Sequence, residues 1–240
     1  MTKMFTYNGR RMTTWNLFTG CDFNCSYCWA RKLAEGKLRK SYPNGFVPTV
    51  HPDRFNKRFH PDDFVFPVSM GDIAFAPSVV EDHVVATANK YPETKFLLCS
   101  KKPDIFRKVK FHLPNVYLGT TLETNREYGV TRASPPLVRY LTMWNLTSPH
   151  KFVSIEPLMD FDLLTFVRWI GHIKPEIIEV GADNYRNNLP EPSADKVNAL
   201  LVHLRKICPV VIEKQGLERV LLHPSTLLAI LPLPRGGGLC

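Results

Sequence analysis

A β-like run and a loop with three cysteines meet in residues 12–28, MTTWNLFTGCDFNCSYC. The threonines and aromatic residues of 12–18 favour a strand, and Thr19-Gly20 is typical of its end. The loop that follows carries Cys21, Cys25 and Cys28. Three thiols this close along the chain can bind one metal centre from a single loop.

Further β-like runs alternate with helix-like stretches along the rest of the chain. The runs cover residues 64–70, 95–99, 116–120, 152–155, 177–180 and 209–212. The run at 64–70 contains Pro67, which fits a central strand poorly because proline cannot donate to the ladder. The near-continuous apolar character of these runs indicates strands buried on both faces, as in parallel βα units.

The pattern predicts an α/β fold, a single-domain partial TIM-like (β/α) barrel of six to seven parallel strands. A doubly wound sheet is the alternative, because periodicity alone cannot close a barrel. Ser78 and Glu81 form a capping-box pattern that opens a helix toward Lys90. Ser193 is the predicted N-cap of another helix, and residues 137–146 and 161–173 also have helical spacing.

Length and composition indicate one globular domain. The chain has 240 residues, 44% hydrophobic and 22% charged, so we expect a domain over 1–240 with its core at about 12–216 and a C-terminal extension at 217–240. No apolar run is long enough to span a membrane, and the N-terminus lacks the apolar region of a signal peptide. We therefore expect a cytoplasmic protein without a membrane partner, whose clustered cysteines bind metal instead of forming disulfides.

The number of cysteines in the loop has a chemical meaning. A [4Fe–4S] cube contains four irons, so three cysteines leave one iron open, and the amine and carboxylate of an amino acid can chelate it. The alternatives are a zinc site completed by a histidine, or three unrelated cysteines. Zinc sites more often use paired C-x2-C units, and the sequence has no second pair.

The C-x3-C-x2-C spacing, with Tyr27 just before the third cysteine, resembles the signature of the radical S-adenosylmethionine (radical SAM) superfamily. The resemblance implies a [4Fe–4S] cluster on Cys21, Cys25 and Cys28, with S-adenosylmethionine as cofactor. It implies reductive cleavage to methionine and a 5′-deoxyadenosyl radical, which abstracts hydrogen from a substrate. It also implies that Tyr27 lies by the adenine and that a reduced flavodoxin- or ferredoxin-type protein donates the electron.

Other segments resemble a narrower group, the small phage-associated radical SAM proteins whose substrate is unassigned. These segments are residues 100–103, 118–123, 152–157 and 213–216. Spore photoproduct lyase, a DNA-repair member of the superfamily, is a more distant relative. No second cysteine cluster is present, so auxiliary Fe–S centres are not expected.

Polar residues follow the predicted strands at the ends where parallel α/β folds bind ligands. The relevant stretches are Ser69-Met70-Gly71-Asp72, Cys99-Ser100-Lys101-Lys102, Thr120-Thr121-Leu122-Glu123, Ser154-Ile155-Glu156-Pro157, Gly181-Ala182-Asp183-Asn184 and Glu213-Lys214-Gln215. We expect Ser69, Gly71 and Asp72 to bind the cofactor's ammonium. Radical SAM proteins have Gly-Gly-Glu at this place, whereas this chain has Met70-Gly71-Asp72, with one glycine missing and a shorter acid.

The later strand ends supply further predicted cofactor contacts. Lys101 can pair with the methionine carboxylate, and Thr121 or Glu123 can accept from the ribose. By resemblance, Glu156 and Gly181 line the adenosine pocket.

Two residues are predicted to act on the substrate. Cys99 and Lys214 both lie at strand ends, and a thiol can return a hydrogen atom to a product radical. Cys208 closes a predicted helix and is expected to be an inert core thiol, and Cys240 ends a glycine-rich tail.

The positive charge is concentrated in the first half of the chain. The net charge is +9, and residues 1–110 hold 18 Lys/Arg against 10 Asp/Glu. Eight basic residues interleave with Tyr42, Phe46, Phe55 and Phe59. They are Arg31, Lys32, Lys37, Arg39, Lys40, Arg54, Lys57 and Arg58. Bases stack on aromatic rings while cations neutralise phosphates, so the segment suits a nucleic-acid groove.

The alternative for this segment is an ordinary basic helix whose phenylalanines, Phe55 and Phe59 above all, pack on the barrel. Our leading substrate class is a nucleic-acid base or nucleotide. A small metabolite or a peptide is the alternative substrate, and a zinc-stabilised nucleic-acid-binding module without catalysis is the alternative function.

Overall fold

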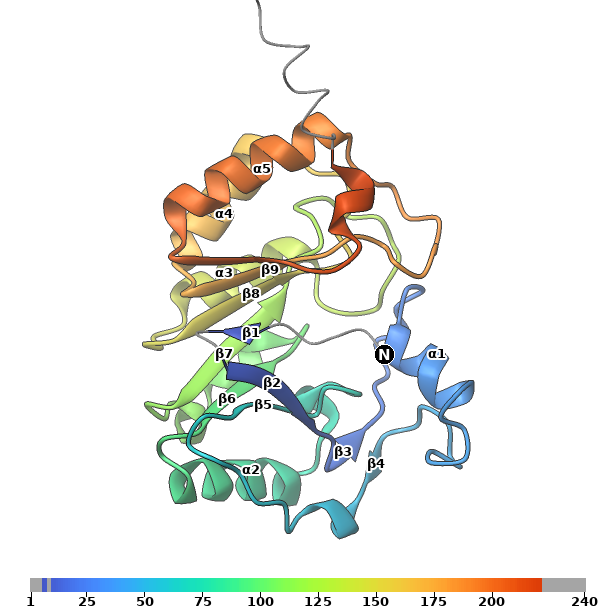
Figure 1. The fold of residues 1–240 in the computed structure, drawn as a ribbon, viewed down its shortest axis with the longest axis vertical. Coiled ribbons are helices and arrows are strands. Elements are labelled where there is room, and N and C mark those ends of the chain that lie inside the picture. The colour runs from blue at the N-terminus through green and yellow to red at the C-terminus, as the bar shows by residue number, and fades with distance from the viewer. Residues whose placement is uncertain (1–5, 8–9, 222–240) are drawn as a thin grey trace, which may run out of the picture.

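Seven parallel strands form one curled sheet, a half-barrel (Figure 1). The computed structural model describes residues 6–7 and 10–221. The parallel strands are β2 (Arg10–Trp15), β5 (Phe64–Pro67), β6 (Lys95–Cys99), β7 (Val116–Thr121), β8 (Lys151–Ile155), β9 (Ile177–Val180) and β10 (Val210–Glu213). β1 (Thr6–Tyr7) pairs antiparallel with β2 at the edge, and β3 (Phe18–Thr19) pairs with β4 (Thr49–Val50) in a separate ribbon.

The strand order decides between the two predicted architectures. Each parallel strand lies beside the previous one, in the order β2-β5-β6-β7-β8-β9-β10. A doubly wound sheet would reverse its order at a switch point, and no reversal occurs among the described strands. The predicted α/β partial barrel is therefore confirmed.

Helices join the strands and cover the sheet. The α-helices are α1 (Trp29–Glu35), α2 (Ser78–Lys90), α3 (Pro136–Asn145), α4 (Leu163–Ile173) and α5 (Ala194–Ile207). The 3-10 helices are η1 (Pro52–Arg54), η2 (Ile73–Phe75), η3 (Pro103–Arg107), η4 (Val109–Phe111) and η5 (Leu217–Val220). α2 to α5 lie on the outer face of the half-barrel, whereas α1 stands beside β3 at the end of the sheet (Figure 1). None of the helices in the described ranges is long and apolar enough to cross a membrane.

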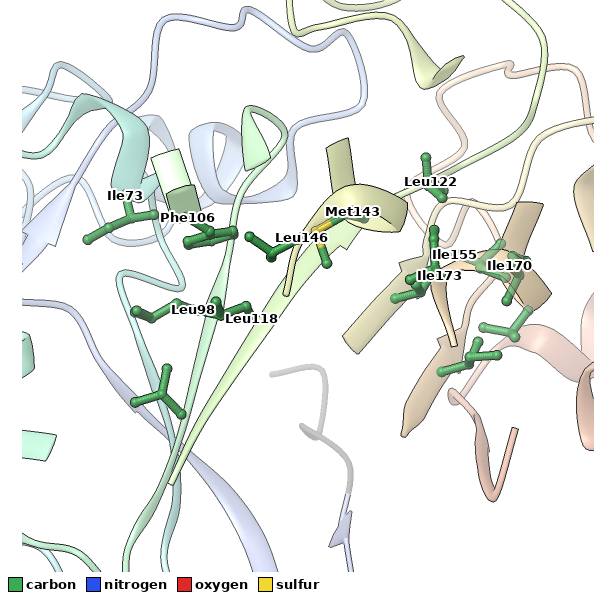
Figure 2. Close-up of a cluster of buried hydrophobic side chains, with 14 of the residues drawn as sticks. Ile73, Leu98, Phe106, Leu118, Leu122, Met143, Leu146, Ile155, Ile170 and Ile173 are labelled. Atoms are coloured by element: carbon green, nitrogen blue, oxygen red, sulfur yellow. The ribbon is translucent and has the colours of Figure 1, made fainter. Parts of the chain in front are cut away.

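Alternation along each strand divides the buried side chains between two cores. On the outer face, Leu98, Leu118 and Ile155 pack with residues of α3 and α4 (Figure 2). On the inner face, a second cluster contains Leu97 and Tyr117. Residues two positions further along these strands share this face, so they face the inside of the half-barrel at the carboxyl ends of the strands.

The central strand β5 tolerates Pro67 because the proline is its last residue. β5 pairs with β6 only through Phe64 and Val65, so no hydrogen bond of that ladder needs the N–H group that Pro67 lacks. On the other side Pro67 pairs with Trp15 of β2. The strand predictions are otherwise confirmed to within a few residues at each end.

One predicted helix cap is confirmed and one is wrong. Ser193 caps α5 and accepts a hydrogen bond from the Lys196 amide at 3.4 Å. Ser78, in contrast, is the first residue of α2 and makes no cap, because Pro77 holds the N-cap position. The other half of the supposed box, Glu81, is buried and pairs instead with Lys108 and Lys110.

The end of the chain is described only in part. η5 begins the predicted C-terminal extension. The residues from 222 onward, Cys240 included, lie outside the described residues. Cys208 closes α5 and is buried, in agreement with its prediction as a core thiol.

Candidate functional site

Two glycines attach the cysteine loop to the end of β5. Gly20 and Gly71 form an isolated bridge, and the Gly20 amide donates to the Met70 carbonyl at 3.0 Å. A Cβ on Gly20 would lie 2.4 Å from the Val47 carbonyl carbon, and one on Gly71 would lie 2.8 Å from the Gly20 oxygen. Gly20 also has φ +95°, a conformation that favours glycine. Both positions therefore need glycine so that the backbones can approach.

Each cysteine sulfur of the loop has its own hydrogen-bond partner. The Phe23 amide donates to Cys21 Sγ at 3.4 Å, and the Arg31 amide donates to Cys28 Sγ at 3.4 Å. Cys25 Sγ lies 3.0 Å from the Thr131 hydroxyl. All three thiols are free and half-buried. Burial raises the pKa of Cys21 and of Cys28, and the neighbouring loop cysteines raise them further.

A second loop, residues 122–135 between β7 and α3, covers the cysteine loop. The Ser26 amide donates to the Val130 carbonyl at 2.9 Å, and the Arg132 amide donates to the Phe23 carbonyl at 2.7 Å. Val130 and Tyr128 also pack beside Tyr27. This covering loop is not among the predicted site elements, because its polar composition carries no signal that it returns to residues 21–28.

Tyr27 belongs to a buried group of charged side chains. Its hydroxyl donates to Glu123 Oε1 at 2.5 Å, and Lys101 Nζ lies 5.1 Å from its ring centre and also binds Glu123. Arg139 Nη1 lies 2.9 Å from Glu123 Oε2 and donates to the Thr121 carbonyl. The structure thus brings together the predicted Tyr27, Lys101, Thr121 and Glu123, with Arg139 added.

The charges of this group set the protonation state of Glu123. Burial alone would raise the pKa of Glu123, but Arg139 and Lys101 outweigh burial and hold it well below its usual range. The Tyr27 pKa is raised by burial and by the Glu123 charge. Arg139 was missed in the sequence, although a lone arginine in the apolar stretch 137–146 is a usable signal, since buried arginines are normally paired.

Both carboxylate oxygens of Asp72, the residue predicted to bind the cofactor's ammonium, already accept hydrogen bonds from the protein. Its Oδ1 accepts from Ser100 Oγ at 2.6 Å and from the Ala74 amide at 3.0 Å, and its Oδ2 accepts from the Lys101 amide at 2.9 Å. Burial raises the Asp72 pKa. Ser69 donates to Asn16 Oδ1 at 3.0 Å. Asp72 therefore joins the turns after β5 and β6 and holds the backbone of Lys101.

A second charged group lies at the ends of β8, β9 and β10. Lys214 Nζ binds Glu156 and lies 3.5 Å from Glu179 Oε2, while Ser154 Oγ donates to Glu179 Oε1 at 2.6 Å. A Cβ on Gly181 would lie 2.7 Å from Glu156 Oε1, so Gly181 makes room for that carboxylate. Burial lowers the Lys214 pKa, but Glu179 and Glu156 outweigh it and raise the pKa above its usual value.

Glu179 was not among the predicted site residues. A carboxylate inside the apolar run 177–180 was the available signal, because a buried acid needs a partner. Burial raises the pKa of Glu156, which stays paired with Lys214.

Cys99 lies between the two charged groups, at the inner-face end of β6. Burial raises the pKa of Cys99 to about 12, and the charges of Glu179 and Asp72 add to the effect. The Cys99 thiol is therefore protonated at neutral pH.

The cysteine loop supplies the three thiols that a [4Fe–4S] cluster with one open iron would need. Thiolate ligands of such clusters accept hydrogen bonds at sulfur. The Phe23 and Arg31 amides donate to Cys21 and Cys28, and the Thr131 hydroxyl, which donates to the Phe23 carbonyl at 3.4 Å, lies 3.0 Å from Cys25 Sγ. Beside the loop, the Arg31 guanidinium donates to the Cys21 carbonyl at 3.5 Å, and its buried Nε has no hydrogen-bond partner. Within residues 6–7 and 10–221, no group of three His, Cys, Asp or Glu side chains is arranged to hold a single metal ion.

The aromatic rings of the basic segment are packed into the protein. Tyr42, Phe46 and Phe59 are buried, and Phe55 packs against the main core. The packing alternative therefore holds for these rings, since a buried ring cannot stack on a base.

Several of the segment's cations are also bound to the protein: Arg31 pairs with Glu35, and Lys32 donates to the Asn187 side chain. Arg54 Nη1 donates to the Asn16 carbonyl at 3.0 Å, and Lys57 Nζ donates to the Thr14 carbonyl at 2.7 Å. The remaining exposed cations include Lys37, Arg39 and Lys40.

More than half of the chain matches one protein-family model. A family model described as "Protein of unknown function (DUF5131)" matches residues 10–171. The chain belongs to this DUF5131 family. The matched stretch contains the cysteine loop, Asp72, Lys101, Glu123 and Glu156, whereas Glu179 and Lys214 lie beyond it. A search of curated proteins gave no match.

Proposed function

We propose that this DUF5131 chain is a radical SAM enzyme with a [4Fe–4S] cluster on Cys21, Cys25 and Cys28. The observation that carries the proposal is that each of the three sulfurs has its own hydrogen-bonding group beside it, namely the Phe23 amide, the Arg31 amide and the Thr131 hydroxyl. When bound, such a cluster supplies the single electron that cleaves S-adenosylmethionine to methionine and a 5′-deoxyadenosyl radical. The C-x3-C-x2-C spacing and the half-barrel with polar strand ends support the same proposal.

The chain's own residues would bind and orient the cofactor. Tyr27, fixed by Glu123 and Lys101, would hold the adenine. The Lys101 ammonium would meet the methionine carboxylate, and Asp72 would act by fixing the backbone from which Lys101 extends. Glu156, already oriented by Lys214, would accept from a ribose hydroxyl.

Cys99 would act on the substrate side. Its thiol keeps its proton at neutral pH because burial raises its pKa to about 12, and only the S–H form can give a hydrogen atom. In that step the hydrogen atom leaves Cys99 Sγ for the product radical, and the odd electron stays on sulfur. Lys214, held between two carboxylates, would orient a substrate group beside it.

The substrate class that we propose is a nucleic-acid base or nucleotide. The net charge of +9 supports it, because a nucleic-acid enzyme needs several cations near its site. The exposed Lys37, Arg39 and Lys40 follow α1, the helix that begins at the cysteine loop. A small metabolite or a peptide is the alternative substrate for the same chemistry.

The test is metal analysis of protein that is purified anaerobically and reconstituted with iron and sulfide. We expect about four irons per chain and, after reduction, a [4Fe–4S]⁺ EPR signal that changes when S-adenosylmethionine is added. Alanine at Cys21, Cys25 or Cys28 should abolish the signal, whereas Cys99→Ala should retain the iron. Stoichiometric zinc without iron would contradict the proposal and favour a zinc-stabilised module.

A further inference from the structure

The loop after β9, residues 183–191, has a strained backbone that its neighbours hold in place. Arg186 has φ 52° and Asn188 has φ 56°, a left-handed conformation that asparagine tolerates and arginine rarely adopts. The Asn187 amide, which lies between them, donates to the buried Asp183 carboxylate at 2.5 Å. Strain of this kind persists where surrounding contacts over-determine it, often at ligand sites.

The loop is tied to the rest of the protein on two sides. Lys32 of α1 donates to the Asn187 side chain. Arg219 of η5 donates to the Asp183 carbonyl at 3.3 Å and pairs with Glu191. The loop is thus fixed relative to the helix that begins at Cys28.

Residues of this loop and Arg219 of η5 line an open cavity of about 460 Å³, within the size range of small-molecule sites. Its lining is Asp183, Arg186, Asn188, Leu189, Glu191 and Arg219. Leu189 also packs with Tyr27 and Met159 in the cluster that Cys25 adjoins. Leu189 therefore belongs both to the cavity lining and to the hydrophobic cluster that contains Tyr27.

Exposed groups of the same loop and of α1, next to the cavity lining, have the chemistry of a nucleotide site. The two acids of the lining already have protein partners: Asp183 accepts from the Asn187 amide, and Glu191 pairs with Arg219. Tyr185 is 39% exposed, and Lys32 Nζ lies 5.9 Å from its ring centre. Arg186 and Asn188 are exposed beside it. An exposed aromatic ring stacks on any base, cations meet phosphate, and an amide can read a base edge.

We propose that the loop 183–191 and its cavity bind a nucleotide of single-stranded nucleic acid, with the base on Tyr185 and the phosphate at Lys32 and Arg186. The site rests on the proposed function, for which it names the substrate class and the binding residues. It shares Lys32 with the basic segment 31–60, but its stacking ring is the exposed Tyr185, whereas Tyr42, Phe46 and Phe59 of that segment are buried. Tyr185 would stack on an unpaired base. In a single strand the base is already unpaired, so binding needs no free energy to open a duplex.

The experiment measures binding of a fluorescein-labelled single-stranded oligonucleotide of mixed sequence to the reconstituted protein by anisotropy, at several salt concentrations. Tyr185→Ala should weaken binding roughly 5- to 150-fold, whereas Tyr185→Phe keeps the stacking ring and should bind like the wild type. Arg186→Ala should weaken binding and lower the slope of log affinity against log salt by about 0.7, because one phosphate contact is lost.

Arg168→Ala is the matched control. Arg168 is an exposed arginine of α4, on the outer face of the half-barrel. It should leave both the affinity and the salt slope unchanged. Melting curves of each variant check that the fold is intact.

Two outcomes would overturn the inference. One is wild-type protein that does not bind the oligonucleotide at low salt; the other is Tyr185→Ala and Arg168→Ala proteins that bind equally well. Iron content and S-adenosylmethionine cleavage are measured on the same samples. If both are intact while binding is absent, the nucleotide site is wrong and the proposed cofactor chemistry stands. If iron is absent, the proposed function itself fails.

Discussion

The Thr131 hydroxyl lies 3.0 Å from Cys25 Sγ, although 106 positions separate the two residues in the chain. The contact joins the loop between β7 and α3 to the cysteine loop. Thr131 also accepts from the Ala133 amide at 3.1 Å, so its own loop orients the hydroxyl. Once Cys25 is a thiolate, the hydroxyl can only donate to it.

Thr131→Val should lower the reduction potential of the bound cluster, on the order of tens of millivolts. Valine keeps the shape but removes the donor, and a hydrogen bond to sulfur stabilises the more negative, reduced cluster. An EPR-monitored redox titration measures the change. Thr131→Ser keeps the hydroxyl and should retain the wild-type potential. Equal potentials in the valine and serine variants would contradict this role.

Asp72→Ala should lower the free energy of unfolding by about 1–3 kcal/mol, because Ser100 Oγ and two backbone amides lose their acceptor. It should also weaken S-adenosylmethionine binding by freeing the Lys101 backbone. Urea denaturation and equilibrium dialysis measure the two effects. Asp72→Asn keeps one oxygen for Ser100 and should recover part of the stability. If the alanine variant binds S-adenosylmethionine as tightly as the wild type, Asp72 stabilises the fold and has no role in cofactor binding.

Glu123→Gln should destabilise the protein by about 3–5 kcal/mol at neutral pH, because it leaves Arg139 buried without its counter-charge. Since the native pKa of Glu123 is depressed, its contribution is present above the unfolded pKa of about 4.3 and is lost as the pH falls toward the native value.

Urea denaturation of both proteins as a function of pH tests the sign of this effect. The stability difference between wild type and Glu123→Gln should be largest at neutral pH and should shrink below about pH 4. The control Glu213→Gln breaks a partly exposed pair with Arg205 and should cost less than about 1 kcal/mol. A difference that stays constant down to acid pH would exclude an ionised Glu123 as its cause.

Gly181→Ala should destabilise the protein by about 1–3 kcal/mol, because the new Cβ would lie 2.7 Å from Glu156 Oε1. It should also displace the Glu156 carboxylate from Lys214. Gly171→Ala in α4 is the matched control. The nearest atom to its Cβ is Ile207 Cδ1 at 3.9 Å, so it should be neutral or stabilise the helix by about 0.5–1 kcal/mol. Thermal denaturation of both variants provides the comparison, and equal melting temperatures would contradict the prediction.

The sequence by itself determined the strands, most of the helices and the cysteine loop. These features depend on local patterns: apolar runs of strand length, helical spacing, and three cysteines within one short stretch. It also determined which polar residues stand at strand ends. Residues an even number of positions apart on a strand share a face, so Cys99 lies on the same face as the core residue Leu97, and Thr121 on the same face as Tyr117.

Only the tertiary structure decided which of these residues meet. Thr131, Arg139 and Glu179 became site residues because folding brings them beside Cys25, Glu123 and Lys214 from distant parts of the chain. The physical reason is burial. A buried charge or polar group must find its partner among the groups that the folded chain supplies. The local sequence can therefore mark Arg139 and Glu179 as buried charges, but only spatial proximity decides which residue each of them pairs with.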